Sequence, residues 1–222
     1  KGKEWIIIPS KENDSENFEK NVDKLKTLSH KNWCTHSFNA EPYLSEGDFH
    51  ILLDNGKPRL GVRFYEDSIT EIQGVQNNSE IPLEYFEDAK EHIETNNYNL
   101  DYRATDEFEN AEIKKAECEE AKKVLQPAIE NNDFPKILDY FHIKTKEDKD
   151  GFYTISHYDL KHTGREIKPA DLGVNENAIF KKVKHIEGKM NLEGSKLTDT
   201  GELESVGGYT TIPNCELKTL GK

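Results

Sequence analysis

Two consecutive stretches of twenty residues decide how the last third of the chain folds: VKHIEGKMNLEGSKLTDTGE at 183–202 and LESVGGYTTIPNCELKTLGK at 203–222. Recurrence at a fixed period of this length is typical of repeat solenoids. Stacked aliphatic residues are expected to form a continuous core, and glycines to allow positive φ at the bends. The matched positions are Val183 with Leu203, Ile186 with Val206, Gly188 with Gly208, Leu192 with Ile212, Leu197 with Leu217 and Gly201 with Gly221.

An earlier copy with the same internal spacing is predicted at Gly151, Ile155, Leu160 and Gly164. A longer interval separates it from the next copy and is expected to hold an inserted loop around residues 168–177. Together, the copies of Gly-x3-aliphatic-x4-Leu-x3-Gly predict a short β-solenoid. Natural solenoids end in a polar capping unit. Because this sequence stops within a repeat, we expect it to be a piece of a longer protein.

The centres of the two later copies, LEGSKL at 192–197 and IPNCEL at 212–217, resemble the L-x-x-N/C-x-L centre of leucine-rich repeats. Ser195 and Cys215 stand at the position whose side chain caps backbone groups in the turn. The resemblance covers roughly residues 151–222 and implies a protein-binding scaffold. The sequence departs from that family upstream, at the first leucine position, so a horseshoe and a β-helix both remain open.

The first part of the chain predicts an α+β domain. An Asn55-Gly56 turn between two β-rich runs indicates a hairpin over 48–65. A third strand at 68–74 would complete an antiparallel meander. The remaining expected elements are a strand at 5–8, a helix from about 18 to 28, a loop at 39–47 and a helix from Pro82 to about Glu94.

The middle of the chain is rich in Glu, Lys and Ala, and predicts a mostly solvated helix over 105–126. Pro127 is expected to break or restart it, and one or two short helices should end near His142. The predicted fold class is therefore α+β: a small antiparallel sheet with helices in residues 1–100, a helical connector at 101–146, and a short leucine-rich-repeat-like or β-helix-like solenoid at 147–222.

Composition limits the classes of partner. The formal net charge of -13 would repel a phosphate backbone, so nucleic-acid binding is disfavoured. No apolar run approaches the roughly 18 residues of a membrane span, so none is expected in this fragment. The three cysteines are far apart and support neither a disulfide framework nor a structural zinc site. The sequence does not fix the localisation, and a cytoplasmic one is favoured.

A thiol and an imidazole lie close together in the segment Trp33-Cys34-Thr35-His36. A cysteine near a histidine can act as a thiolate nucleophile when the imidazole lowers the pKa of the thiol. Cys34 and His36 are therefore the catalytic candidates. The competing interpretation is a buried, inert core cysteine, because residues two apart point the same way only in an extended strand.

A second group of polar residues follows the predicted sheet strands. Arg63 lies on the second strand, and Glu71, Gln73 and Asn77 lie on or just after the third. These side chains are candidates to line a polar groove for a small ligand or a peptide. The competing interpretation is turn chemistry, since asparagine and glycine are usual in a strand-to-helix loop.

The order of Cys34, a Gly-Asp-led strand, a second strand and Glu71-Ile72-Gln73-Gly74 with Asn77 is similar to a segment of PcfJ-like proteins of plasmids and phages. The resemblance covers about residues 30–80. It implies a bacterial or mobile-element origin and supplies no established catalytic residue.

No Walker A, GxGxxG, GxSxG or HExxH motif occurs, and the eight histidines are dispersed, so neither a cofactor nor a metal site is expected. The preferred hypothesis is a non-catalytic interaction module of a longer bacterial or phage protein, which binds another protein through the solenoid surface. The alternative is an enzyme with its active site around Cys34 and His36, in which the repeats serve as a docking platform.

Overall fold

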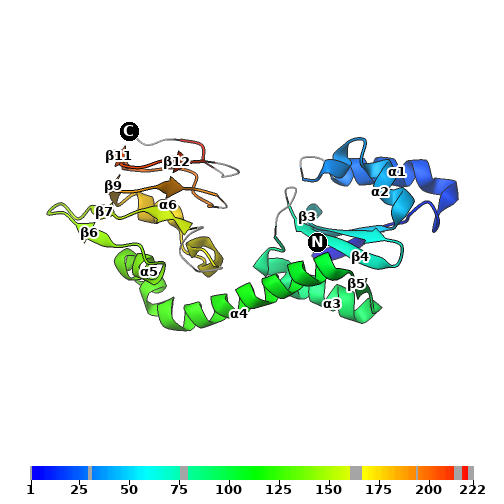
Figure 1. Ribbon diagram of the computed structural model, residues 1–222, viewed down its shortest axis with the longest axis horizontal. Coiled ribbons are helices and arrows are strands. Elements are labelled where there is room, and N and C mark those ends of the chain that lie inside the picture. The colour runs from blue at the N-terminus through cyan, green and yellow to red at the C-terminus, as the bar shows by residue number, and fades with distance from the viewer. Residues whose placement is uncertain are drawn as a thin grey trace. The chain divides into compact units, whose positions relative to one another are not determined.

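The protein is described by a computed structural model over residues 2–29, 32–75, 80–160, 167–193, 195–212 and 217–219. It is a mixed α+β protein with several small sheets, as the sequence predicts at this level of detail (Figure 1). The chain divides into two compact units, Lys1–Lys115 (unit 1) and Ala116–Lys222 (unit 2). The finer division at residues 100 and 146 stays a prediction.

Unit 1 is built on a five-stranded sheet in the order β1-β2-β3-β4-β5. Its strands are antiparallel except for the parallel pair of β4 and β5. The predicted meander is confirmed, and its first turn has positive φ at Asn55 (51°) and Gly56 (80°), as a tight hairpin turn requires. The strands are β1 (Lys3–Ile8), β2 (Phe49–Asp54), β3 (Lys57–Tyr65), β4 (Ser68–Gly74) and β5 (Asn99–Leu100).

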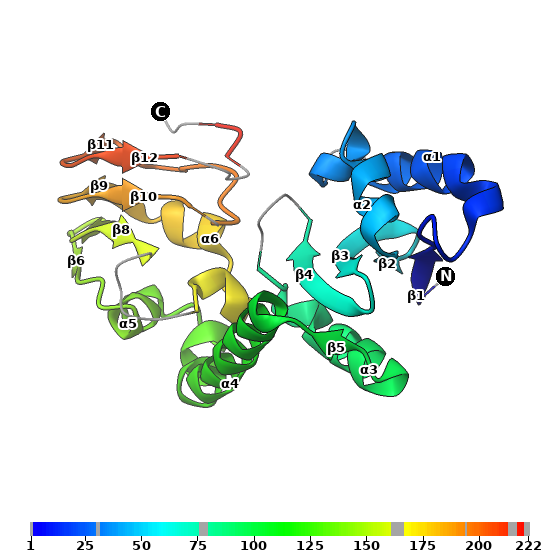
Figure 2. The same cartoon turned by 45° about the vertical axis from the view of Figure 1, so that its right-hand side comes forward.

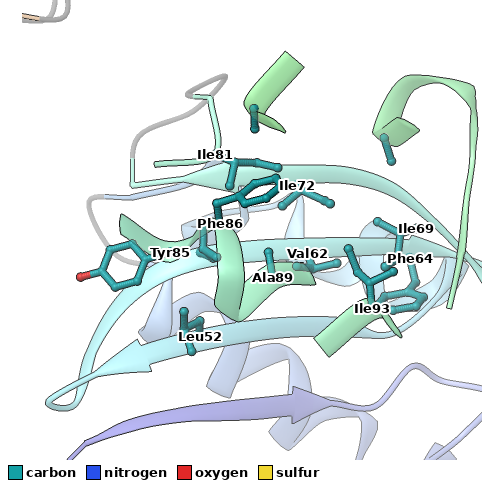
Figure 3. Close-up of a cluster of buried hydrophobic side chains, with 13 residues drawn as sticks. Leu52, Val62, Phe64, Ile69, Ile72, Ile81, Tyr85, Phe86, Ala89 and Ile93 are labelled. Carbon is teal, nitrogen blue, oxygen red and sulfur yellow. The ribbon is translucent and has the colours of Figure 1, made fainter. Parts of the chain in front are cut away.

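Helices cover both faces of this sheet. On one face lie α1 (Phe18–Leu28), which the sequence predicts, and α2 (Ala40–Glu46). On the other face, α3 (Phe86–Asn96) and the first turns of α4 (Tyr102–Glu130) pack on a core that includes Val62, Phe64, Ile72 and Phe86 (Figure 3). Successive strand residues point to opposite faces. Helices on both sides therefore explain why five successive residues of β2, Phe49 to Leu53, are all buried.

Two expectations for unit 1 need correction. Residues 39–47 are not a loop, because they form α2, which buries Ala40 and Leu44 one turn apart. The expected helix at Pro82 begins instead as a 3-10 turn at Leu83–Tyr85 that leads into α3. Gly47, which ends α2, has no room for a side chain, since a Cβ atom there would lie 2.6 Å from the Phe64 carbonyl oxygen.

The long helix α4 also differs from expectation, because Pro127 lies inside it and does not break it. The proline stands in the last turn of the helix. Its missing N–H removes one bond, to the carbonyl of exposed Lys123, and water can satisfy that carbonyl. The Asn131 amide still donates to the Pro127 carbonyl, at 3.2 Å. The predicted short helix that follows is present as α5 (Phe134–Tyr140).

Unit 2 contains two small ladders of very short strands (Figure 2). One sheet has the order β11-β9-β7-β6 and the other has the order β12-β10-β8. All pairs are parallel except for β6 with β7. The strands are β6 (Thr145–Glu147), β7 (Tyr153–Ile155), β8 (Tyr158–Asp159), β9 (Val183–Ile186), β10 (Met190–Asn191), β11 (Ser205–Val206) and β12 (Thr210–Thr211).

The later part of each ladder has a constant register. Ile186 pairs with Val206, and Met190 pairs with Thr210, so each residue lies beside the one twenty positions further along. The isolated bridge between Asp199 and Thr219 has the same offset. The predicted match of Ile186 with Val206 is therefore confirmed.

The alignment predicted for the earliest copy was wrong. Ile155 lies beside Ile186 and not beside Leu192. The carbonyl of Ser156, and not Gly151, lies against Gly188, because a Cβ atom there would be 2.8 Å from the Ser156 oxygen. The prediction assumed that matched residue types keep a fixed spacing. It failed because the first coil has fewer residues between its two strands.

The insertion predicted around residues 168–177 is present. It holds a 3-10 turn at Pro169–Leu172 and the short helix α6 (Glu176–Phe180), which lie between β8 and β9. Ser195 has the predicted capping role, since its hydroxyl accepts from the Leu197 amide at 3.0 Å. Three predicted features lie outside the described residues: Cys215, Gly164 of the earliest copy, and most of the last repeat centre.

Candidate functional site

A small pocket in unit 1 lies between the sheet and the segments that follow α1. The strands β3 and β4 form one wall, and the 3-10 turn at Cys34–His36 and α2 form the other. The cavity volume is about 10 Å³, which is space for roughly one water molecule. It therefore suits a small polar group and not a whole ligand. Its lining residues are Trp33, Cys34, Thr35, Tyr43, Phe49, Gly61, Arg63, Glu71 and Gln73.

Strand register brings the predicted groove residues together. Arg63 pairs with Glu71, and Gly61 pairs with Gln73, so these residues share the face that α1 and α2 cover. Gly61 permits the indole of Trp33 to lie against the strand, because a Cβ atom there would approach the ring to 3.0 Å. Trp33 is fixed by its Nε1–H, which donates to the Gly74 carbonyl at 2.8 Å.

Arg63 is the cation of the pocket. Its guanidinium lies over the ring of Tyr43, with 3.7 Å between Cζ and the ring centroid. One Nη donates to Glu46 at 2.6 Å. Its Nε is buried and has no hydrogen-bond partner among the described residues. The stacked, ion-paired arrangement holds the side chain in one orientation.

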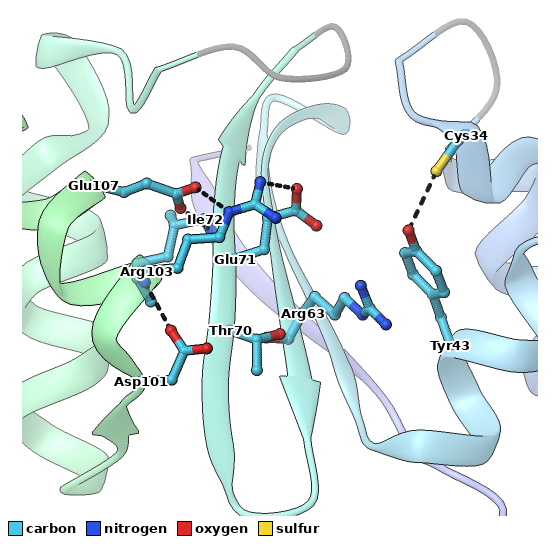
Figure 4. Close-up of polar contacts among 10 residues, drawn as sticks. Cys34, Tyr43, Arg63, Thr70, Glu71, Ile72, Asp101, Arg103 and Glu107 are labelled. Carbon is cyan, nitrogen blue, oxygen red and sulfur yellow. Dashed lines mark hydrogen bonds and ion pairs between the residues drawn. The ribbon is translucent and has the colours of Figure 1, made fainter.

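Glu71 is the anion of the pocket, and its side chain is only 10% exposed. Arg103, in the first turn of α4, donates to it at 2.8 Å and also to Glu107 at 3.1 Å (Figure 4). Glu107 accepts from the Ile72 amide at 2.9 Å with its other oxygen. These two carboxylates, Glu71 first, raise the pKa of Arg103. The buried charge of Glu71 is thereby neutralised within unit 1.

The Cys34 thiol donates to the Tyr43 hydroxyl across 3.7 Å (Figure 4). Burial, followed by the interaction with Cys34, raises the pKa of Tyr43, so the phenol is protonated at neutral pH. A protonated phenol cannot take a proton from the thiol. At neutral pH the Cys34 thiol and the Tyr43 phenol therefore share a hydrogen bond without proton transfer.

The structure separates the two catalytic candidates. Cys34 lines the pocket, whereas His36 is not among the lining residues, and its Nδ1 donates to the Trp33 carbonyl at 2.7 Å. The 3-10 turn explains this, because residues two apart diverge around such a turn. Of the groove candidates, Arg63, Glu71 and Gln73 meet in the pocket. Asn77 lies outside the described residues.

The sequence carried no signal for Tyr43, which lines the pocket, or for Arg103, which binds Glu71. Each lies on a helix distant in sequence from the strand residue that it contacts. Arg103 lies at the start of a helix, one turn before Glu107. This spacing indicates an ion pair between the two residues, but it does not indicate the bond from Arg103 to β4.

A second polar surface lies on the four-stranded sheet of unit 2. Thr154 pairs with His185, which pairs with Ser205, and all three alternate with the inward residues Ile155 and Ile186. They therefore point away from the core. His185 Nδ1 lies 2.9 Å from the Ser205 hydroxyl. We call this row of three residues the ladder face.

No family model, curated protein or solved structure matches the chain. The resemblances to leucine-rich repeats and to PcfJ-like proteins therefore stay predictions. None of the described helices is long and apolar enough to cross a membrane. Within the described ranges, no three His, Cys, Asp or Glu side chains are grouped as a metal site.

Proposed function

We propose that the chain is a non-catalytic protein-interaction module in which unit 2 is a short β-solenoid. The observation that carries this proposal is the offset of twenty residues between paired strands, seen at His185 with Ser205 and at Met190 with Thr210. Successive coils of a solenoid contact only their neighbours and create an extended surface, which such proteins use for binding.

Burial along the coils supports the same interpretation. Ile186, Met190 and Leu192 of the middle coil are at most 2% exposed, whereas Ile212 of the next coil is 42% exposed. Each coil thus buries the apolar row of the coil before it. Such a unit has a continuous core and an outward face free for contacts.

The ladder face is the surface that we assign to the partner. Its hydroxyl and imidazole groups offer both donors and acceptors, which suits adaptable contacts with another protein. The net charge of -13 argues against a nucleic acid as the partner.

A photo-crosslinking residue at Ser205 tests this assignment. In cells of the source organism, we expect a discrete crosslinked protein from this position and none from Lys123, an exposed position on α4 of unit 2. The crosslinked protein, once purified, should bind the chain, and Ser205→Arg should weaken that binding by about tenfold or more. Identical crosslinking patterns from the two positions would count against the ladder face.

An enzyme centred on Cys34 is the second candidate function. One observation favours it: Cys34 lies in the same pocket as Arg63, Glu71 and Gln73, so a thiol, a cation and an anion meet there. In that case the coils would dock the substrate and the thiol would be the nucleophile.

Thiol alkylation at pH 7 separates the two functions. The slow internal standard is Cys118, which is 4% exposed, donates to the Asp171 carbonyl at 3.2 Å, and has a pKa raised by burial. In a Cys215→Ser background, the interaction module predicts that Cys34 reacts no faster than free N-acetylcysteine. An enzyme predicts a rate about tenfold above that reference. A Cys34 as slow as Cys118 removes the main support for the enzyme.

A further inference from the structure

The strand β1 forms one edge of the sheet in unit 1, since its one neighbour among the described strands is β2 (Figure 2). The Asn55 amide donates to the Gly2 carbonyl at 3.3 Å, which places Gly2 in a hydrogen-bonded pair. Such pairs alternate along an antiparallel ladder. The backbone groups of Lys3, Trp5 and Ile7 therefore point outward, away from β2.

A second hydrogen bond gives the same result independently. The Phe64 amide donates to the Asp48 carbonyl at 3.0 Å, so Asp48 faces β3, and by alternation so does His50. His50 pairs with Ile7, and the backbone groups of Ile7 must then point to the open side. β1 consequently offers a row of outward donors and acceptors.

A groove of about 300 Å³ runs beside this edge, between β1 and α3. Trp5 is its aromatic wall, and that wall is firmly placed. Its ring stacks on His92 with 3.9 Å between the centroids and 11° between the planes. A rigid indole presents a large surface to a bound side chain at a low cost in conformational entropy.

The charges of the groove are unequal. Lys3 pairs with Asp88 at 2.6 Å, so these two cancel. Glu91, exposed on α3 and also lining the groove, has no ion pair with a described residue. The lining residues therefore keep one uncompensated negative charge, that of Glu91, which favours a cation in the groove.

We propose that the outer edge of β1 binds an extended basic peptide segment, which adds to the sheet as a strand and places a lysine or arginine side chain in the groove against Trp5 and Glu91. The backbone of the peptide bonds to the outward groups of β1, and alternate side chains reach the groove, as in other strand additions. The cation then meets both an indole face and a carboxylate.

This site belongs to unit 1 and is independent of the ladder face in unit 2, so either proposal can fail alone. A second copy of the chain is a poorer occupant of the edge, because two chains of charge -13 repel each other.

A labelled, capped seven-residue peptide that alternates valine and lysine is the probe. We expect saturable binding by fluorescence anisotropy. Two comparison peptides show which groups of the probe cause the binding. Glutamate in place of lysine should abolish binding. Proline at alternate positions should weaken binding about tenfold, because backbone donors are lost. No saturable binding of the valine–lysine peptide, or equal binding of the proline peptide, would overturn the proposal.

Variants of the protein test the two halves of the site. Ile7→Pro removes an outward N–H that β2 does not use and should weaken binding about tenfold, whereas Ile7→Thr keeps that N–H and should not. Glu91→Gln should weaken binding severalfold. If Ile7→Pro fails to fold, the proline peptide still decides. A concentration-dependent dimer of the wild type that Ile7→Pro abolishes would show that a second copy occupies the edge, and would overturn the peptide assignment.

Discussion

Replacing Glu176 with alanine is expected to lower the free energy of unfolding of unit 2 by about 3–5 kcal/mol. The carboxylate is 2% exposed and accepts from the Tyr158 hydroxyl, from the Ser195 hydroxyl at 3.1 Å, and from the Lys196 amide at 2.7 Å. Alanine would leave the buried hydroxyls of Tyr158 and Ser195, and the Lys196 amide, without this acceptor. It would also remove the bonds from Glu176 of α6 to β8 and to the segment that follows β10.

Hydrogen exchange measured by mass spectrometry can localise this loss. We expect faster exchange in the strands β8, β9 and β10 of the alanine variant. The fluorescence of Trp5 and Trp33, the two tryptophans of the chain, reports on unit 1 and should change little. Tyr158→Phe removes one donor and keeps the other two, so it should cost only about 1 kcal/mol.

The matched control for this experiment is Glu187→Ala. Glu187 is exposed in the turn after β9, and its loss should change stability by less than about 0.5 kcal/mol. Equal stability of the Glu176 and Glu187 variants would show that the buried carboxylate does not hold unit 2 together.

Local patterns in the sequence predict the elements of unit 1 well. The Asn55-Gly56 turn and the strand predicted at 68–74 depend on neighbours in sequence, and both appear in the structure. The loop expected at 39–47 was wrong because a helix of seven residues, with only Ala40 and Leu44 buried, is too short to produce a periodic signal. The prediction that Pro127 breaks the helix was wrong for a different reason, because the effect of a proline depends on its place within the helix.

The repeat shows where a sequence pattern stops being informative. The two later copies share a length of twenty residues, and their pairing follows directly. The earliest copy differs, because Ile155 and Tyr158 are three apart where Ile186 and Met190 are four apart. A search for fixed spacing cannot find a copy with a deletion, so it matched unrelated glycines.

Strand register explains which part of the candidate site was predictable. Arg63 and Glu71 lie opposite each other across a hairpin, so the sequence could place them together. Bonds such as that of Arg103 to Glu71 link positions 32 apart through tertiary packing. His50 and His92, 42 apart, are another such pair, and the sequence carried no sign of it.

This histidine pair predicts that acid weakens unit 1. His50 is 2% exposed, and its Nδ1 lies 2.9 Å from His92 Nε2, so one ring donates and the other accepts. Burial, followed by the charge of His92, lowers the pKa of His50 from 6.5 to about 4, while Asp48 opposes the shift. Burial also lowers the pKa of His92. Both imidazoles are therefore neutral in the folded protein near pH 7.

The direction of the pH effect follows from proton counts. Between pH 6.5 and about 4, the unfolded chain binds a proton at His50 that the folded chain does not. The free energy of unfolding is thus fully retained above pH 6.5 and falls by about 3 kcal/mol as the pH drops towards 4. His92 contributes in the same direction.

Urea unfolding followed by tryptophan fluorescence at several pH values between 7 and 4.5 measures this effect in unit 1. Carboxylates titrate in the same range, so the wild type is compared with His50→Leu/His92→Leu, which keeps every carboxylate and removes both imidazoles. The stability of the double variant should depend less on pH over this interval, because no neutral imidazole pair remains to be protonated. Parallel pH profiles for the two proteins, or a His50 proton resonance that titrates near 6.5, would contradict the buried neutral pair.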